Sequence, residues 1–119
     1  MPAHLVFYHN PRCSKSRDAL ALLEARDIKL SIRRYLDNPL SYEELSTLAA
    51  RLDGPTSALL RENETQWQTL ALDDPSDEVR LRAIALNPRL MQRPVLDRGD
   101  RALIGRPPEA LLALLEKVG

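Results

Sequence analysis

The sequence predicts an α/β fold in which helices flank a mixed four-stranded sheet and a helical insert occupies about residues 41–92. Three observations support this prediction. Residues 5–35 have a strand-helix-strand pattern, helical periodicity then replaces it, and two short apolar runs near residue 100 precede a last helix. With 119 residues and 44% hydrophobic content, the chain fits one compact domain, predicted over residues 1–119.

The first strand is predicted at residues 5–8, a short apolar run that suits a strand buried on both faces. A helix is expected from about residue 14 to residue 26, where apolar residues recur at helical spacing. Residues 30–35 alternate with a period of two, which indicates a second strand, and Asp37-Asn38-Pro39 ends it. These pieces form a β-α-β unit.

The insert is expected to begin with a helix capped by Ser41 and Glu44, whose spacing matches a capping box. Its apolar face would comprise Leu45, Leu48, Ala49 and Leu52. Shorter helical segments are predicted around residues 59–61 and 67–72. Another helix should start after Ser76 and stop before Asn87-Pro88, with one face formed by Val79, Ala83 and Leu86.

Residues 94–96 and 102–104 read as two strands joined by a hairpin loop that contains Gly99. Pro107 and Pro108 suit the first turn of a final helix, where a missing N–H costs nothing. Its buried face would comprise Leu111, Leu112, Leu115 and Val118. This order of elements is typical of a thioredoxin-like fold.

The overall charge points to no polyanionic partner. Seventeen basic and seventeen acidic side chains cancel, so neither nucleic acid nor an anionic membrane surface is an expected partner. The sequence has no signal-peptide pattern and no run of about 18 apolar residues that could span a membrane. A single cysteine cannot close an internal disulfide. A cytoplasmic location is therefore expected.

The only cysteine, Cys13, follows the Asn10-Pro11 turn and begins the first predicted helix. Backbone N–H groups and the positive end of the helix dipole lower the pKa of a thiol in that position. Arg12, Lys15 and Arg17 crowd the same turn, although cations oppose the dipole there. The alternative interpretation is a buried, inert thiol among solvated surface charges. Cations placed against the helix dipole are unfavourable there, and such an unfavourable arrangement is more common at functional sites.

His9 lies four residues before Cys13 and could either stabilise a thiolate or simply end the strand. One cysteine and two histidines offer no metal-ligand spacing, so no metal site is predicted. No glycine-rich nucleotide motif is present either, and no bound cofactor is expected.

Three arginines, Arg61, Arg93 and Arg106, each stand at the end of an apolar segment, from which a guanidinium can reach a cleft. The planar fork of arginine suits an oxyanion, whereas taken singly each is more often a surface residue. The Arg93-Pro94 bond also admits a cis peptide.

Along nearly its whole length the chain resembles the glutaredoxin-coupled, ArsC-like arsenate reductases and their shorter YfgD-like relatives, which have a thioredoxin-like fold with a helical insert. Arg12 departs from the small residue that usually precedes the cysteine in that family. The segments that carry the resemblance are Tyr8-His9-Asn10-Pro11-Arg12-Cys13, Ser16-Arg17, Tyr35-Leu36-Asp37-Asn38-Pro39, Leu59-Leu60-Arg61, Arg93-Pro94 and Gly105-Arg106-Pro107.

The resemblance implies that Cys13 is a nucleophile that attacks arsenate or a similar oxyanion, and that His9 favours its thiolate. It implies that Arg61, Arg93 and Arg106 clamp the oxyanion and that the Arg93-Pro94 bond is cis. The matched residues in supporting positions are Asn10, Ser16, Arg17 and Pro94. Glutathione is the implied co-substrate and glutaredoxin the implied protein partner.

Two other functions remain open from the sequence. One is a non-catalytic binding or regulatory protein, related to regulators that bind RNA polymerase and sense oxidation through a Cys-x-x-Cys pair. Ser16 stands at the second position of that pair, which excludes an intramolecular disulfide switch. The other is a thiol reductase that acts on a different oxyanion or on a glutathionylated substrate.

Overall fold

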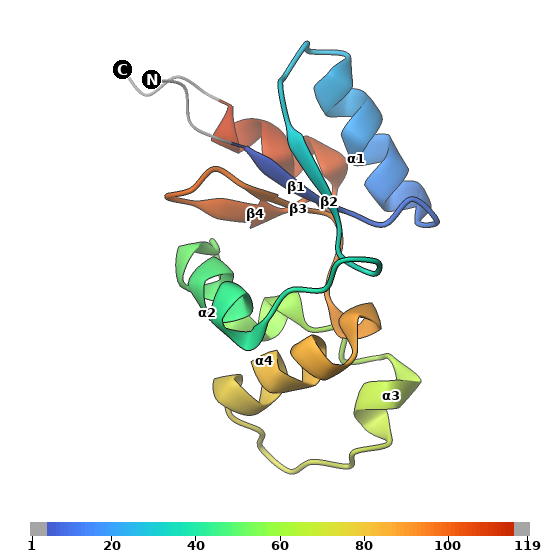
Figure 1. Ribbon diagram of the computed structural model, residues 1–119, viewed down its shortest axis with the longest axis vertical. Helices are drawn as coiled ribbons and strands as arrows, with labels where there is room; N and C mark the ends of the chain where they lie inside the picture. Colours follow the sequence, from blue (N-terminus) through green and yellow to red (C-terminus); the bar gives the residue numbers. More distant parts are fainter. Residues whose placement is uncertain (1–4, 116–119) are drawn as a thin grey trace.

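A computed structural model describes residues 5–115, and its centre is a mixed four-stranded sheet (Figure 1). The strands are β1 (Val6–His9), β2 (Ser31–Arg34), β3 (Val95–Asp97) and β4 (Ala102–Ile104). Their order is β2-β1-β3-β4, with β1 and β2 parallel and the other two pairs antiparallel. The predicted β-α-β unit and the predicted hairpin are both confirmed.

Helices and the loops between them form the rest of the described chain. The α-helices are α1 (Ser14–Glu24), α2 (Tyr42–Arg51), α3 (Thr65–Gln68) and α4 (Asp77–Leu86), and the 3-10 helices are η1 (Thr56–Leu59), η2 (Pro88–Leu90) and η3 (Pro108–Leu114). The segment between β2 and β3 is therefore helical, as predicted. The last helix is a 3-10 helix that buries Leu111 and Leu114, while Val118 lies outside the described residues. Within residues 5–115, no helix is long and apolar enough to cross a membrane.

The sheet has an apolar core on each face. On one face, Phe7 and Leu96 pack with Leu23 of α1 and Leu111 of η3. The opposite face carries α2, η1, α4 and η2, and α3 lies beyond them, farther from the sheet (Figure 1). Because Phe7 and its neighbour Tyr8 belong to different cores, β1 is buried on both faces, as its apolar run predicts.

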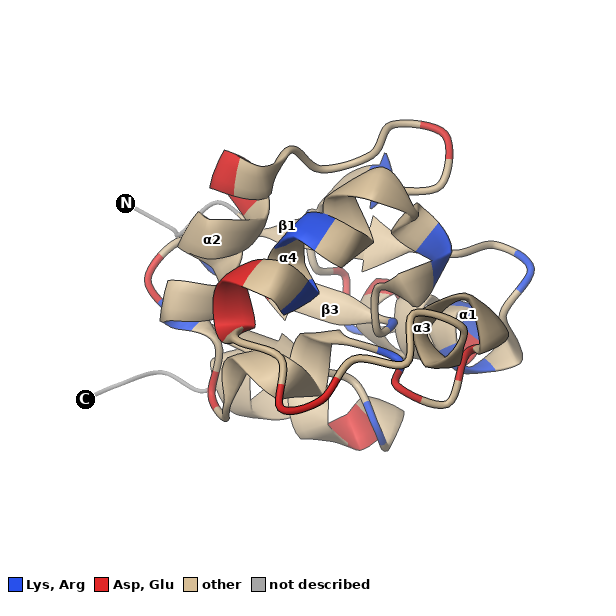
Figure 2. Ribbon diagram, turned by 90° about the horizontal axis from the view of Figure 1, so that it is seen from below, with Lys and Arg blue, Asp and Glu red and all other residues tan. Residues whose placement is uncertain are grey.

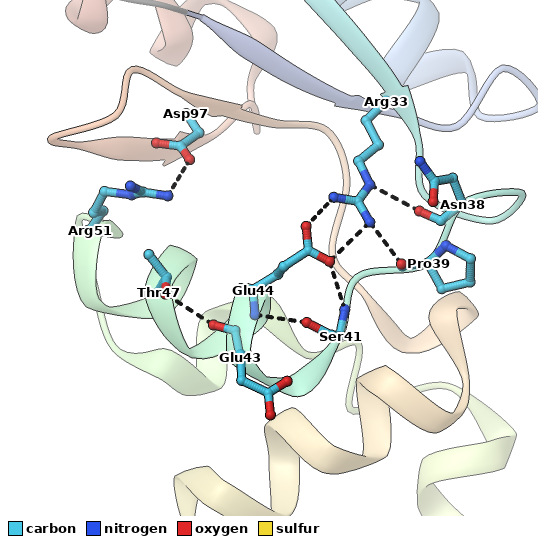
Figure 3. A network of polar contacts seen from close by, with 9 residues as sticks. All are labelled: Arg33, Asn38, Pro39, Ser41, Glu43, Glu44, Thr47, Arg51 and Asp97. Atoms are coloured by element: carbon cyan, nitrogen blue, oxygen red, sulfur yellow. Dashed lines mark hydrogen bonds and ion pairs between the residues drawn. The ribbon is translucent and has the colours of Figure 1, made fainter.

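The capping box of α2 forms as predicted and is joined by an arginine from the sheet (Figure 3). The Glu44 N–H donates to Ser41 Oγ at 3.1 Å, and the Ser41 N–H donates to Glu44 Oε1 at 3.0 Å. Arg33 of β2 makes an ion pair with the same carboxylate and donates from Nη2 to the Pro39 carbonyl at 2.8 Å. This network fixes the direction in which the chain leaves the sheet.

The predicted apolar face of α4 is wrong at Val79 and Leu86, whereas Ala83 is half-buried and packs against the core. Val79 and Leu86 are 38% and 88% exposed, whereas Leu81 and Ile84 are buried. The helix packs against α2 and η2, so the buried stripe runs through Leu81 and Ile84, the pair that shares a core with Leu90. Acidic residues in its first turn are followed by arginines, as the red and blue segments in Figure 2 show.

Candidate functional site

The loop after β1 places Cys13 at the N-terminus of α1. The Cys13 N–H donates to the Asn10 carbonyl at 3.0 Å, which closes the turn predicted at Asn10-Pro11. The Cys13 carbonyl accepts the Arg17 N–H at 3.0 Å, the first hydrogen bond of the helix. Cys13 is thus the N-cap residue, with an extended backbone and a partly exposed side chain.

The pKa of the Cys13 thiol is lowered from its ordinary value. Partial burial is the largest effect and raises the pKa, but several favourable contacts together outweigh it. The backbone N–H groups of Ser16 and Lys15 bond to the sulfur, and the Arg93 guanidinium both bonds to it and attracts its negative charge. The first turn of α1 and one distant arginine therefore stabilise a thiolate at position 13.

His9 contacts the first turn of α1 through Ser16. Its Nδ1 lies 2.7 Å from Ser16 Oγ, and the same hydroxyl accepts the Asn10 N–H at 3.0 Å. Burial, followed by the charges of Arg34 and Arg17, lowers the pKa of His9 and favours the neutral ring. In the tautomer of the neutral ring that carries its proton on Nε2, Nδ1 accepts the hydroxyl proton of Ser16. His9 and Ser16 thus fix the end of β1 against the helix that carries Cys13.

Arg61 and Arg93 meet Cys13 in one cleft of about 610 Å³. The polar and charged side chains that line it are Asn10, Arg12, Cys13, Tyr35, Arg61, Glu64, Asn87, Arg89 and Arg93. The cleft thus has four arginines and one glutamate, and Arg61 pairs with that glutamate at 2.5 Å. Although the whole chain is neutral, its cysteine lies in a locally positive cleft.

The arginines of the site are close enough to repel one another. Burial lowers the pKa of Arg61, and the positive charges of Arg93 and Arg106 lower it further. The Nε of Arg93 is buried and has no hydrogen-bond partner within residues 5–115. Both features cost free energy, and a bound anion would relieve the repulsion.

Arg106 lies beside the cleft instead of lining it. It is exposed and borders a shallow neighbouring cleft of about 580 Å³, together with Arg61. Its Nε donates to the Arg93 carbonyl at 2.9 Å. The structure therefore brings Arg61 and Arg93 to Cys13 directly, and connects Arg106 to them through the backbone of Arg93.

The Arg93-Pro94 peptide bond is cis, as expected, and so is the Arg106-Pro107 bond. Pro94 is buried, and the Gly105 N–H donates to its carbonyl at 2.9 Å. A Cβ at Gly105 would lie 2.9 Å from both Pro94 Cγ and Leu111 Cδ1, so the glycine is needed for this close approach.

The remaining supporting residue, Arg17, is exposed and braces the turn. Its Nη1 donates to the Pro11 carbonyl at 3.0 Å, which fastens the loop before Cys13 to the first turn of α1. Within residues 5–115, no three histidine, cysteine, aspartate or glutamate side chains are grouped so that they could hold a metal ion.

Sequence patterns missed several residues that line the cleft. Tyr35 is buried, with a pKa raised by burial, and its side chain bonds to Asn10. Glu64 and Arg89 come from the insert, where nothing in the local pattern distinguishes them from surface charges. Two signals for Tyr35 were usable. It opens one of the segments that carry the family resemblance, and it directly follows a strand parallel to β1, where the carboxyl ends of parallel strands share a sheet edge.

Residues 8–114 match the ArsC family. An arsenate reductase of Neisseria meningitidis serogroup A is 42% identical over 119 residues, which cover 97% of this chain and all of that protein. An uncharacterized Escherichia coli protein, YfgD, is 39% identical over 97% of this chain and 99% of its own length.

Solved structures agree with these sequence relatives. A structure described as an arsenate reductase from Vibrio cholerae has a TM-score of 0.87 and 37% identity. The match covers 95% of this chain and 98% of that one. Residues 8–114 match the family, the relatives match over nearly their whole length, and the fold is thioredoxin-like. The chain therefore belongs to the ArsC family.

Proposed function

We propose that this protein reduces arsenate to arsenite with electrons supplied by external thiols. The observation that carries the proposal is a thiol of lowered pKa that shares a cleft with Arg61 and Arg93. Arsenate is a tetrahedral anion near neutral pH, so a thiolate can attack it only where positive groups neutralise both reactants. Relatives of nearly the same length named as arsenate reductases support this substrate over other oxyanions.

In the first step, the Cys13 sulfur attacks arsenic and forms an S–As bond, while one oxygen leaves as water. One Cys13 thiol and one dihydrogen arsenate anion give one thiol-arsenate anion and one water molecule, with arsenic still in the +5 state. Arg93, which contacts the sulfur, and Arg61 would hold the arsenate oxygens and the charge that develops on the leaving oxygen.

The second step needs a thiol from outside the chain, because the sequence has one cysteine. We propose glutathione, whose sulfur forms a disulfide with Cys13. The S–As bond breaks and its electron pair stays on arsenic, which takes up the thiol proton of glutathione and leaves as dihydrogen arsenite in the +3 state. Glutaredoxin then takes glutathione from Cys13 by thiol-disulfide exchange and restores the free thiol.

The other site residues act by positioning these groups. His9 and Ser16 hold the end of β1 against the first turn of α1, so that its N–H groups face the sulfur. Arg106 binds the carbonyl of Arg93 and orients the residue that touches the sulfur. We assign Arg106 to the clamp in this indirect role.

The proposal is tested by measuring arsenite formation with arsenate, glutathione and glutaredoxin. Wild type should turn over, whereas Cys13→Ser should be inactive, because a hydroxyl at this position has no comparable ionised form. Arg26→Ala is the control, since Arg26 is exposed just beyond α1 and lines neither of the clefts described above. An inactive wild type, or an active Cys13→Ser variant, would refute arsenate reduction by this cysteine.

A further inference from the structure

The cleft at Cys13 is much larger than an arsenate ion needs. Its volume is about 610 Å³, within the range of sites that hold drug-sized ligands, whereas arsenate has five non-hydrogen atoms. A second cleft of about 280 Å³ adjoins it. The two clefts share Asn10, Arg12 and Leu36, so a molecule seated in one can extend into the other.

The adjoining cleft has its own set of charges, from Arg12, Arg34 and Asp37. Arg34 ends β2 and lies beside His9 in the parallel register, and Arg12 immediately precedes Cys13. Within residues 5–115, none of the three side chains has a hydrogen bond or ion pair with another part of the chain. Two cations and one anion thus line a cleft that shares part of its wall with the cleft of Cys13.

We propose that this adjoining cleft binds the α-amino-acid end of the thiol co-substrate, with Arg12 and Arg34 on its carboxylate and Asp37 on its ammonium group. The γ-glutamyl end of glutathione carries these two charges on one carbon. A cleft of about 280 Å³ lies just below the usual range for a whole ligand, which suits one end of a tripeptide. The rest of the molecule would then extend through the shared boundary toward Cys13.

This inference rests on the proposed function, but it can be tested without arsenate. The Cys13 thiolate attacks one sulfur of glutathione disulfide, forms a mixed disulfide and releases one glutathione thiolate. Two sulfurs exchange partners, and no other oxidant or reductant is needed. An uncharged reagent, hydroxyethyl disulfide, undergoes the same exchange but has no amino-acid end.

The experiment measures the rate of mixed-disulfide formation by mass spectrometry for Arg12→Ala and Arg34→Ala, with Arg26→Ala as the matched control. Loss of a charge-assisted hydrogen bond should slow the reaction with glutathione disulfide about tenfold or more in each variant. The reaction with hydroxyethyl disulfide should change by less than about twofold. Equal losses with both reagents would mean that the arginines act on the thiolate, and would overturn the proposal.

Asp37→Asn gives a separate test of the ammonium contact. It should slow the reaction of glutathione disulfide, but not that of a disulfide analogue that lacks the α-amino group. No discrimination between these reagents would overturn the assignment of Asp37. Selective exchange without any arsenate reduction would refute the proposed function and leave this subsite standing, so the two failures are distinguishable.

Discussion

At the scale of single residues, the ionisation of Cys13 depends on burial, on the first turn of α1 and on Arg93. Burial raises the pKa of the thiol, and the N–H groups of α1 and this guanidinium lower it. We expect the pH profile of iodoacetamide alkylation to have its midpoint below the value of about 8.5 for a free thiol. Arg93→Ala should move the midpoint upward and Arg26→Ala should not. A wild-type midpoint at or above 8.5 would contradict this prediction.

The arginines should differ in their effects on arsenate reduction. Arg61→Ala and Arg93→Ala each remove a donor that lines the cleft with Cys13, so each should lower kcat/KM for arsenate by about a hundredfold. Arg106→Ala should cost less, because Arg106 reaches the site only through the Arg93 carbonyl. Steady-state kinetics at saturating glutathione measure these values, and wild-type rates for Arg61→Ala and Arg93→Ala would exclude them from the site.

The sequence could predict that Arg61 and Arg93 share a cleft with Cys13, because the turn before the helix and the family motif are both local features. The sequence could not show that Arg106 lies beside the cleft while Arg61 and Arg93 line it. The place of Arg106 depends on its hydrogen bond to the Arg93 carbonyl, and Arg93 is thirteen residues away in the chain. The same limit applies to His9. Its distance in sequence from Cys13 is compatible with direct contact, but the folded loop directs Nδ1 to Ser16.

At the scale of elements, the junction between β2 and α2 depends on the Glu44 carboxylate. Arg33 and the Ser41 N–H lower the pKa of Glu44 to about 2. The side chain is 47% exposed, so solvent screening limits its contribution, and we expect Glu44→Gln to cost about 1 kcal/mol at pH 7. Glu43→Gln is the matched control, since Glu43 occupies the same turn of the same helix.

The pH dependence of this contribution has a defined sign. Because folding lowers the pKa of Glu44, the carboxylate stabilises the fold above its ordinary pKa, and this contribution is lost as pH falls toward 2. Urea unfolding of wild type and Glu44→Gln at several pH values should therefore show a difference that shrinks below about pH 4.5. A constant difference from pH 7 to pH 2.5 would contradict the role of the charge.

Local patterns predicted the elements better than the faces they bury. The capping box and the proline breaks are signals within a few residues, and they placed α2 and the end of α4 correctly. The buried face of α4 depends on how this helix packs against α2. The spacing of apolar residues within the ten residues of α4 does not determine that packing. Ile32 is 48% exposed for a similar reason, because β2 is an edge strand.

At the scale of the whole molecule, the insert and the sheet share one apolar core. Leu81 and Ile84 of α4 belong to the same cluster as Tyr8 of β1 and Val95 of β3. The insert therefore cannot separate from the sheet without exposing both sides of that core. This packing supports our proposal that residues 1–119 form one domain, and it requires the insert and the sheet to unfold together.

Ile84→Ala tests this coupling. Ile84 is 2% exposed, so the truncation should cost about 2 to 4 kcal/mol. The only tryptophan, Trp67, lies in α3 and packs against the shared core, so its fluorescence reports on the insert. Its urea transition should coincide with that of far-UV circular dichroism in wild type, and both should shift equally in the variant. A fluorescence transition at lower urea would mean that the insert unfolds separately, and that the arginines it contributes can leave Cys13 while the sheet stays folded.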